Sequence, residues 1–541
     1  MPVLNNLKNY RDEILKAEIG ALLFNLGKTH IGFGGWRDNF QHLQNKFKWS
    51  SYKDYIDKSH FDNEVSIISQ NLKNFFDNVN VSILNLTQNV PLKEIMLGGE
   101  SSHDFVKKIF FRGCENVNSG IDKGSPKVQL KPPLWLSNAF GSFKHEVEEK
   151  DFDDVRQTFF RNMDYFLQRN NYYQYPNWQE IRKFIFDEIK PWYSKLLSDS
   201  RYPVNDVSLW DQAYMTASMF KAVLANMILE NSKVQTFQNN PNSIKWRILG
   251  IQYDKLGLSE KGFKPAHIKW YREVSKEIDG EIKRLLEYEY PIGNEVYRDE
   301  TGIYFIVGED LEEDLSNENL AKLKDDLSEI KDKILEVFKD KSKDEFYPAI
   351  FLTKASRGLM NLTYLLEKAK ENFLKSYWSK KDVTINFNNN QAIGICQVCK
   401  QRLVFENDKR DENKNICKTC YEEKTQGRVD EWLNNRNNET IWTTELKDKN
   451  ERIALVVMKF EIMDWLSGEL LNTNILQTGI NWANDVNNFS NELKEIFKNN
   501  QDKRVEYTVL RNYTDPALHS LNIKQHNIIE SLLLERSIGD G

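Results

Sequence analysis

Four of the five cysteines in the 541-residue chain form two Cys-X-X-Cys pairs. The first pair is Cys396 and Cys399, the second is Cys417 and Cys420, and the 17 residues from 400 to 416 separate them. This spacing is typical of two knuckles whose four thiolates converge on one zinc ion. The alternative, two adjacent pairs of reduced and unligated thiols, is less favoured because such cysteines are usually scattered through apolar segments. We predict a structural zinc site, since four thiolates leave no open position for a catalytic water.

Residues 20–28, GALLFNLGK, are a second segment with the pattern of a metal site. They resemble the metal-binding helix of HD phosphohydrolases, in which a His-Asp pair precedes an apolar residue, Gly and Lys. Here Phe24 and Asn25 occupy the positions of that pair. Phenylalanine cannot ligate a metal, and a neutral asparagine is a poor substitute for a carboxylate. We therefore expect that a two-metal hydrolase site has been lost at this position.

Other histidine and aspartate residues are alternative metal ligands. His103-Asp104 is a literal His-Asp pair, and Asp122 lies where such domains often carry a late aspartate. No Gly-Lys follows the pair, and a polar dipeptide at the start of a helix commonly serves as a cap. Capping is therefore the favoured interpretation of His103. His30 and His60 are also not interpreted as metal ligands. We expect them to be surface or hydrogen-bonded core residues.

The composition is that of a chain that buries several cores and has a solvated surface. Charged residues make up 28% and aromatic residues 12% of the chain, and the length implies about three to four domains. The formal net charge of −6 argues against a uniformly basic nucleic-acid binder, although local basic grooves remain compatible with it. A signal peptide and a long apolar run are both absent from the sequence, and the clustered cysteines favour a reducing compartment. We expect a cytoplasmic protein without a membrane contact.

Changes in hydrophobic pattern predict an α+β chain of several domains. Residues 1–235 have apolar side chains at helical spacing and are predicted to be an α-helical region. Residues 236–357 alternate between strands and helices, and residues 358–425 contain a helix followed by the cysteine pairs. Residues 426–541 include a predicted strand, IALVVMKFEI, that could open a second sheet domain.

Residues 236–357 have the pattern β, α, β, β, α, β. The strand in KWRILGIQYD precedes a helix from about Pro265 to Glu289, whose apolar residues recur at gaps of three and four. Two strands then flank a turn at residues 299–302, and a second helix is expected to carry the apolar residues from Leu320 to Val337. The strand YPAIFLTKA follows. This order is that of the split βαβ or ferredoxin-like arrangement, with both helices on one face of an antiparallel sheet.

Several segments together resemble the large, palm-containing subunit of type III CRISPR effector complexes, in particular the divergent branch with degraded active sites. In chain order they are GALLFNLGK, RGCENVNSGIDKGSP, DVSLWDQAYMTASMFKA, EYEYPIGNEVYRDETGIYFIV, the four-cysteine knuckle and IALVVMKFEIMDWLSG. The resemblance spans nearly the whole chain and rests on the order of the segments. It implies an HD-like helical domain, a ferredoxin-like palm, a zinc-bearing linker domain, and then a second palm and a helical C-terminal domain.

The resemblance also implies where a cyclase site would lie. Family members that make cyclic oligoadenylates have a Gly-Gly-Asp-Asp hairpin in the second palm, and this chain has no such sequence. The end of the strand IALVVMKFEI has Lys459 and Glu461, which are candidates for contact with a nucleotide. The turn RDETG has the acidic pair Asp299-Glu300 without preceding glycines. We therefore expect that this chain has no catalytic activity of its own.

The function implied by the resemblance is a scaffolding subunit of an RNA-guided antiviral complex. Its partners would be a CRISPR guide RNA, a target RNA and other type III effector subunits, with zinc as cofactor and ATP as a further candidate ligand. One open alternative is an HD-type metal-dependent nuclease or a cyclic-oligoadenylate synthase. Another is a stand-alone zinc-containing RNA-binding protein, in which KSYWSKK would supply stacking and phosphate-binding groups.

Overall fold

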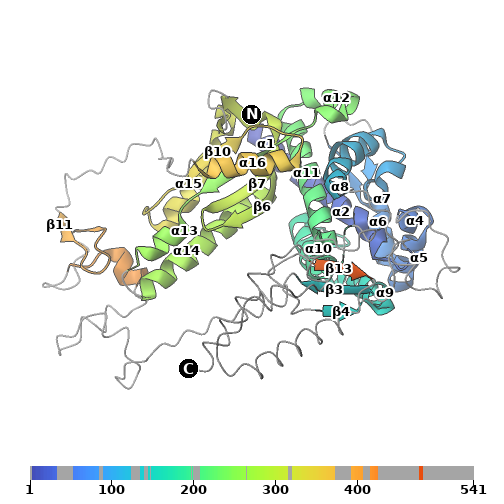
Figure 1. The fold of residues 1–541 in the computed structure, drawn as a ribbon, viewed down its shortest axis with the longest axis horizontal. Helices are drawn as coiled ribbons and strands as arrows, with labels where there is room; N and C mark the ends of the chain where they lie inside the picture. Colours follow the sequence, from blue (N-terminus) through green and yellow to red (C-terminus); the bar gives the residue numbers. More distant parts are fainter. Residues whose placement is uncertain are drawn as a thin grey trace, which may run out of the picture.

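The computed structural model describes residues 3–32, 53–83, 89–122, 134–138, 144–146, 148–196, 198, 207–262, 265–314, 320–371, 392–405, 415–424 and 474–478. They form an α+β structure with a helical N-terminal unit, a six-stranded antiparallel sheet and a small four-cysteine unit (Figure 1). In these ranges, no helix has both the length and the apolar character needed to cross a bilayer.

The N-terminal unit consists mostly of helical segments, in agreement with the apolar spacing of its sequence. They are α1 (Val3–Asn9), α2 (Arg11–Leu23), η1 (Phe24–Thr29), α4 (Asp54–Asp57), α5 (His60–Ile68), α6 (Gln70–Asn78), α7 (Leu92–Leu97), η3 (Gly98–Glu100), η4 (Val106–Glu115), α8 (Asn116–Asp122), η5 (Glu149–Asp151), α9 (Asp153–Arg169), α10 (Trp178–Tyr193), α11 (Leu209–Leu229), α12 (Ser232–Asn239) and η6 (Pro241–Ser243).

Two small sheets accompany these helices. The first pairs β1 (Asn80–Val81) with β2 (Val90–Pro91). In the second, β3 (Leu134–Asn138) pairs with β4 (Lys144–Glu146) on one side and with β13 (Asn474–Thr478) on the other. Strand β13 belongs to the segment that the sequence assigns to a second sheet domain, and its backbone pairs with a strand of the N-terminal unit.

The six-stranded sheet has the strand order β6-β7-β5-β10-β9-β8, and every neighbouring pair is antiparallel. Its strands and accompanying helices are β5 (Trp246–Gln252), α13 (Lys255–Glu260), α14 (Pro265–Arg284), η7 (Leu285–Glu289), β6 (Gly293–Asp299), β7 (Gly302–Gly308), η8 (Glu309–Leu311), β8 (Glu312–Asp314), β9 (Leu320–Leu323), η9 (Asp325–Leu327), α15 (Ser328–Ser342), β10 (Ala349–Thr353) and α16 (Leu359–Lys370). The predicted order β, α, β, β, α, β is present as β5, α14, β6, β7, α15 and β10.

Side chains from β5 and the residue after it show which helices cover each face of the sheet. Tyr253 donates a hydrogen bond to Asp279 of α14 at 2.7 Å, and its ring packs edge to face on Phe338 of α15. Trp246 points the other way, because its Nε1 donates to the Met219 carbonyl of α11 at 3.0 Å. Since side chains alternate between the faces of a strand, α14 and α15 cover one face and α11 covers the other.

The predicted helix over residues 320–337 is wrong in its first part. Leu320 and Leu323 lie in strand β9, and the helix α15 begins only at Ser328. Leu320 pairs with Thr353 of β10, and β8 pairs with the other edge of β9. The leucine spacing suits a helix, but edge pairing with β10 satisfies the backbone of this segment and outweighs the local periodicity.

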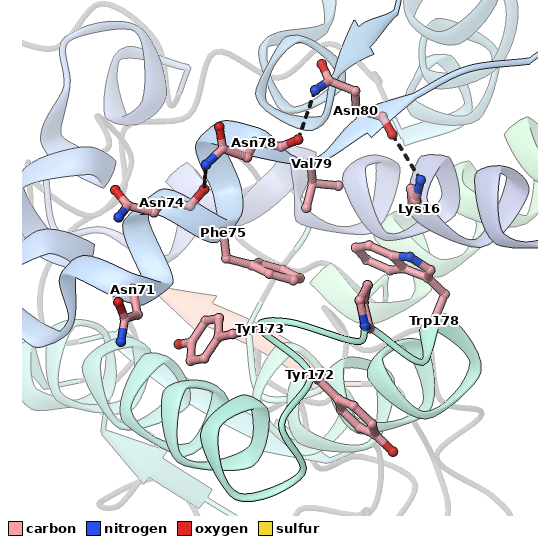
Figure 2. Close-up of a pocket in the computed structure, with 11 residues that line it drawn as sticks. Lys16, Asn71, Asn74, Phe75, Asn78, Val79, Asn80, Tyr172, Tyr173 and Trp178 are labelled. Carbon is pink, nitrogen blue, oxygen red and sulfur yellow. Dashed lines mark hydrogen bonds between the residues drawn. The ribbon is translucent and has the colours of Figure 1, made fainter.

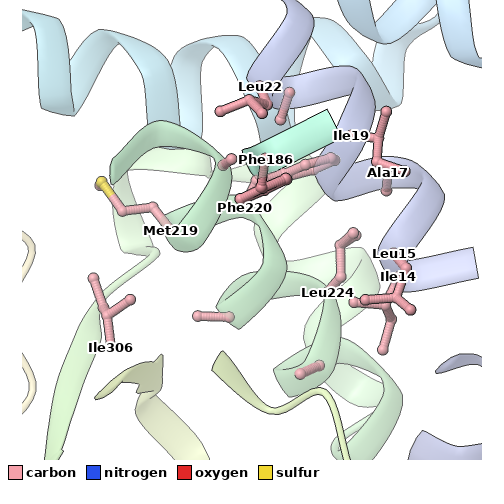
Figure 3. Packing of buried hydrophobic residues seen from close by; sticks show 14 of the residues in the cluster. Ile14, Leu15, Ala17, Ile19, Leu22, Phe186, Met219, Phe220, Leu224 and Ile306 are labelled. Atoms are coloured by element: carbon pink, nitrogen blue, oxygen red, sulfur yellow. The ribbon is translucent and has the colours of Figure 1, made fainter. Parts of the chain in front are cut away.

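Helix α11 connects the helical unit to the sheet. It packs on α2 and also on β6 and β7, so that it is buried along most of its length (Figure 1). A helix with neighbours on several sides needs apolar residues around most of its circumference, as α11 has. Figure 3 shows this packing, with Ile19 and Leu22 of α2 near Phe220 of α11. One continuous hydrophobic cluster includes residues of α2, α11 and the sheet.

A buried ionic cluster crosses the same junction. The Glu18 carboxylate of α2 accepts hydrogen bonds from Arg182 at 2.6 and 2.8 Å, from Lys221 at 3.0 Å and from Asn294 at 2.6 Å. Arg182 also contacts Glu287 at 3.3 Å, and Lys221 donates to the Glu287 carbonyl at 2.8 Å. Each of these five residues is at most 2% exposed. Two carboxylates balance two cations, so the cluster buries no net charge.

The charge balance holds Glu18 in its ionised form. Burial alone would raise the pKa of this carboxyl, but the adjacent Arg182 and Lys221 reverse the effect and lower the pKa to about 2. Ionised Glu18 therefore stabilises the native state at neutral pH.

We predict that Glu18→Gln lowers the free energy of unfolding at pH 7 by about 3 kcal/mol, the value of a pKa shift from 4.5 to about 2. The native carboxylate has the lower pKa, so its contribution is complete above pH 4.5 and is lost as the pH falls toward 2. The difference between wild type and variant should therefore shrink over this range in urea unfolding. Glu281→Gln is the control, because Glu281 pairs with Arg284 at the surface and should contribute less than about 1 kcal/mol. Equal stability of wild type and Glu18→Gln at pH 7 would contradict the prediction.

Candidate metal centre

The four cysteines predicted to bind a metal lie together in the structure. Their sulfur atoms are within 4.8 Å of one another, and all four residues are buried. The Sγ atoms of Cys399 and Cys417 are 3.9 Å apart. Four sulfurs at about 2.3 Å from a common centre would be about 3.8 Å apart, so this separation suits tetrahedral ligation. Across the described ranges, no other group of three or more histidine, cysteine or acidic side chains is close enough to share an ion.

A short hairpin positions the first cysteine pair. Strands β11 (Ala392–Ile395) and β12 (Leu403–Phe405) are antiparallel, and the turn between them holds Cys396 and Cys399. The Cys396 amide donates to the Arg402 carbonyl at 2.8 Å, and the Lys400 amide donates to the Cys396 carbonyl at 2.9 Å. Lys400 has φ +60°, a left-handed conformation that reverses the chain after the second cysteine.

Backbone hydrogen bonds bring the second cysteine pair against the first. The Gln397 amide donates to the Asn415 carbonyl at 2.8 Å, and the Cys417 amide donates to the Cys396 sulfur at 3.2 Å. The Cys420 amide donates to the Cys417 sulfur at 3.5 Å at the start of η11 (Cys420–Lys424). Such amide donors stabilise a thiolate, which is the form that binds a metal.

The thiols also interact with one another. Hydrogen bonds from Cys399, Cys417 and Cys420, together with the Cys417 amide, lower the pKa of the Cys396 thiol. Among the described residues, the apolar cluster around the cysteines is small and is composed of Val398, Val404 and Ile416 with Ile393 and Tyr421 at its edge. So small a core contributes little stability, and structural metal ions commonly stabilise units of this size.

A second, partly buried ionic cluster attaches the four-cysteine unit to the sheet helices. The Glu345 carboxylate, just after α15, accepts hydrogen bonds from Lys424 at 2.8 Å and from Arg402 at 3.0 Å. Lys424 is 1% exposed, and its Nζ lies 4.3 Å from the ring centroid of Trp270 and 4.6 Å from that of Tyr271, both in α14. Burial opposes ionisation of Glu345, but Lys424, Tyr271 and Arg402 together lower the pKa of the carboxyl. Each half of the metal unit thus donates one cation to the same carboxylate.

The two positions at which the sequence resembles an HD-type pair are inside the helical core. Phe24 is buried and packs edge to face on Phe110, with ring centroids 5.3 Å apart. Gly98 has φ +57°, and a Cβ there would lie 2.3 Å from the Phe24 ring, so both its conformation and its contact require glycine. Asn25 is fully buried, and within the described part of the chain neither its Oδ1 nor its Nδ2 has a hydrogen-bond partner. Asp122 is the last residue of α8.

The alternative histidine and aspartate candidates lie apart from the cysteines and do not form a metal cluster with one another among the described residues. Asp104 forms an i,i+4 pair with Lys108 at 3.0 Å, while the His103 carbonyl accepts from the Lys107 amide at 3.1 Å. The rings of His30 and His60 are 6.2 Å apart.

The acidic turn between β6 and β7 is in contact with a lysine of α16. Asp299 accepts from Lys370 of α16 at 2.6 Å and from the Thr301 amide at 2.9 Å. Burial opposes ionisation of Asp299, but the hydrogen bonds from Lys370 and Thr301 and the charge of Lys370 together lower the pKa of this carboxyl. Lys459, Glu461 and the segment KSYWSKK lie outside the described residues.

Neither a protein-family model nor a curated protein matches this chain. The interpretation of the site therefore depends on its geometry. Four buried sulfur donors at tetrahedral separation can hold a metal ion, and they leave no ligand position for a substrate. The sequence did not predict the residues that attach the four-cysteine unit to the sheet helices, which are Glu345, Arg402 and Lys424. Glu345 and Lys424 are 79 positions apart, and no local pattern relates them.

We predict that Glu345→Gln loosens the four-cysteine unit from the sheet helices without removing its metal. The variant leaves the Lys424 ammonium buried without its anion, whereas the cysteines are unchanged. Amide hydrogen exchange in residues 392–405 and 415–424 should therefore become faster, while metal content measured by mass spectrometry stays the same. Glu423→Gln is the matched control, because Glu423 forms only an exposed pair with Lys343 at 3.5 Å. Unchanged exchange in Glu345→Gln would show that the carboxylate does not hold the unit in place.

Proposed function

We propose that the chain is a scaffolding large subunit of an RNA-guided type III CRISPR effector complex. The observation that carries the proposal is the order of the units: a helical unit, a β-α-β-β-α-β sheet and a four-cysteine unit. The subunit that the sequence segments resemble has an HD-like domain, a ferredoxin-like palm and a zinc-bearing linker in this order. The strand order β6-β7-β5-β10, with α14 and α15 on one face, supports the palm assignment.

Zinc is the metal that we assign to the four cysteines. Tetrahedral sites with only sulfur ligands hold zinc or iron, and two knuckles around a single ion are the usual zinc arrangement. The contribution of zinc would be structural. It would hold Arg402 and Lys424, which come from different knuckles, in the relative position that the Glu345 contact needs.

The surroundings of Phe24 and Asn25 support a scaffolding role for the chain rather than a nuclease activity. Phe24 fills its position in the helical core with an aromatic ring, and Asn25 is a neutral side chain without a bonding partner. A two-metal hydrolase needs carboxylate and imidazole ligands that face an open cleft. The continuous core between helical unit and sheet favours the same conclusion, because a rigid body of this kind can present several surfaces to partner subunits in a constant arrangement.

We predict that the purified chain contains one zinc ion and that Cys417→Ser loses it, since a hydroxyl is a poor replacement for a thiolate. Metal analysis by mass spectrometry measures the stoichiometry, and limited proteolysis should detect a less protected segment from 392 to 424. Cys114→Ala is the matched control, because Cys114 is a buried cysteine of the helical unit outside the site. Iron in place of zinc, or no metal in the wild-type protein, would contradict the assignment.

We predict that the chain, expressed with the proteins encoded beside its gene, purifies in a complex with a repeat-derived guide RNA. With ATP, magnesium and a matching target RNA, the complex should make no cyclic oligoadenylate. RNA sequencing of the complex and chromatography of the products measure these outcomes. A chain that purifies alone and binds RNA would favour the stand-alone RNA-binding protein. Manganese-dependent DNA cleavage that is lost in Asp122→Ala would favour the nuclease.

A further inference from the structure

A pocket of about 510 Å³ lies in the helical unit, far along the chain from the four cysteines. Its walls come from α6, the start of β1, α2 and the loop between α9 and α10 (Figure 2). The volume is within the range of small-ligand sites, about 300 to 1,000 Å³. Neither the zinc site nor the proposed scaffold role accounts for this pocket.

Aromatic rings form one side of the pocket. The rings of Phe75 and Trp178 are stacked with centroids 5.7 Å apart, and Tyr173 packs edge to face on Phe75 at 6.1 Å. The Tyr173 hydroxyl donates to Asp164, which holds the ring in place. Tyr172 and Tyr173 are only half-buried, so that part of their surface faces solvent. Figure 2 shows Phe75 between Tyr173 and Trp178.

Asparagine amides on the same helix as Phe75 line a further part of the pocket. Asn71, Asn74 and Asn78 lie on one face of α6, at positions i, i+3 and i+7, and all three side chains are exposed. Asn80 at the start of β1 continues the row. The Asn74 Oδ1 accepts from Gln70 at 3.0 Å, and the Nδ2 atoms of Asn78 and Asn80 donate to backbone carbonyls at 2.8 and 2.9 Å. Among the described residues, this leaves the Asn74 Nδ2 donor and the Asn78 Oδ1 acceptor to bind a ligand edge that carries donors and acceptors side by side.

The charged residues in the pocket wall limit the kinds of ligand that the pocket can bind. Among the described residues that line the pocket, Lys16 is the one charged side chain, and no carboxylate is present. Lys16 is already bonded to Glu13 at 2.6 Å and to the Asn80 carbonyl at 3.2 Å. The described pocket lining has no carboxylate to bind a cationic ligand. Lys16 is a poor partner for a phosphate, because it is already paired with Glu13. The recognised part of the ligand is therefore an uncharged, flat group with a polar edge.

We infer that this pocket binds an unpaired nucleobase of a single-stranded nucleic acid. A nucleobase has a flat face for the aromatic rings, and its edge carries the donors and acceptors that asparagine amides recognise, in particular the N6 and N7 atoms of adenine. Phosphates on either side would remain in solvent at the open mouth of the pocket. Since the inference deepens the proposed function, it rests on that function for the expectation that the polymer is RNA.

The test is direct binding of a fluorescein-labelled eight-nucleotide poly(A) RNA to the purified full chain, measured by fluorescence anisotropy. Tyr172→Ala removes a half-buried ring of the pocket and should weaken binding by about five- to 100-fold, the usual effect of one stacking side chain. Tyr172→Phe keeps the ring and should bind like the wild type. Asn71→Ala combined with Asn74→Ala should weaken binding while the helix remains folded, because alanine favours helix formation.

Tyr165→Ala is the matched control, because Tyr165 is an exposed tyrosine of α9 that does not line the pocket. It should leave the affinity unchanged, and thermal melts verify that each variant is folded. The same assay with a fluorescein-labelled eight-nucleotide poly(dA) DNA distinguishes the two polymers, and weaker binding of either octamer by the pocket variants supports a base site.

Wild-type affinity in both Tyr172→Ala and the double asparagine variant would overturn the inference, as would a wild-type chain that binds neither octamer. Binding of a labelled octaproline peptide that depends on Tyr172, without binding of the octamers, would also overturn it and assign the pocket to a peptide. None of these outcomes decides the proposed function, because copurification of guide RNA with the assembled complex tests that function separately.

Discussion

The buried carboxylate of Glu18 is the constraint on which the arrangement of the structure depends. Its partners come from α10, α11 and β6, so the helical unit and the sheet must meet in one geometry for the charge to be satisfied. A buried ionic cluster adds less net stability than its contacts suggest, because each ion first loses its water. An incorrectly docked sheet, however, would leave a charge buried and unpaired. The cluster therefore acts mainly on specificity, while the surrounding apolar core supplies most of the stability.

The same physical principle recurs at the other side of the sheet. Glu345 receives one cation from each half of the four-cysteine unit, and the aromatic rings of Trp270 and Tyr271 exclude water from Lys424. A metal ion that ties the two cysteine pairs together would also fix the distance between these cations. Two carboxylates, the buried Glu18 and the half-buried Glu345, thus bind partners from different segments and join three units of the chain. This arrangement suits a protein whose role is to hold partners in a constant geometry.

Asn25 is one of several buried polar groups that have no hydrogen-bond partner among the described residues. A buried amide without a partner costs about 1 to 3 kcal/mol, whereas an apolar residue of similar size would cost nothing there. Stability therefore does not account for this residue. Next to it, Phe24 and Gly98 fit each other closely, so the surrounding core is well packed.

The sequence by itself determined the features that depend on local spacing. Cys396, Cys399, Cys417 and Cys420 were predicted as one site because a knuckle is built from neighbouring residues, and the β-α-β-β-α-β order followed from runs of apolar residues. Tertiary structure alone decided that Leu320 and Leu323 lie in a strand, that β13 pairs with β3, and that Glu18 and Glu345 find their partners. These contacts join residues that are far apart in the chain. The local hydrophobic pattern cannot predict them. The free energy of a buried ion pair or of an edge strand depends on the residues it contacts, and these come from distant parts of the chain.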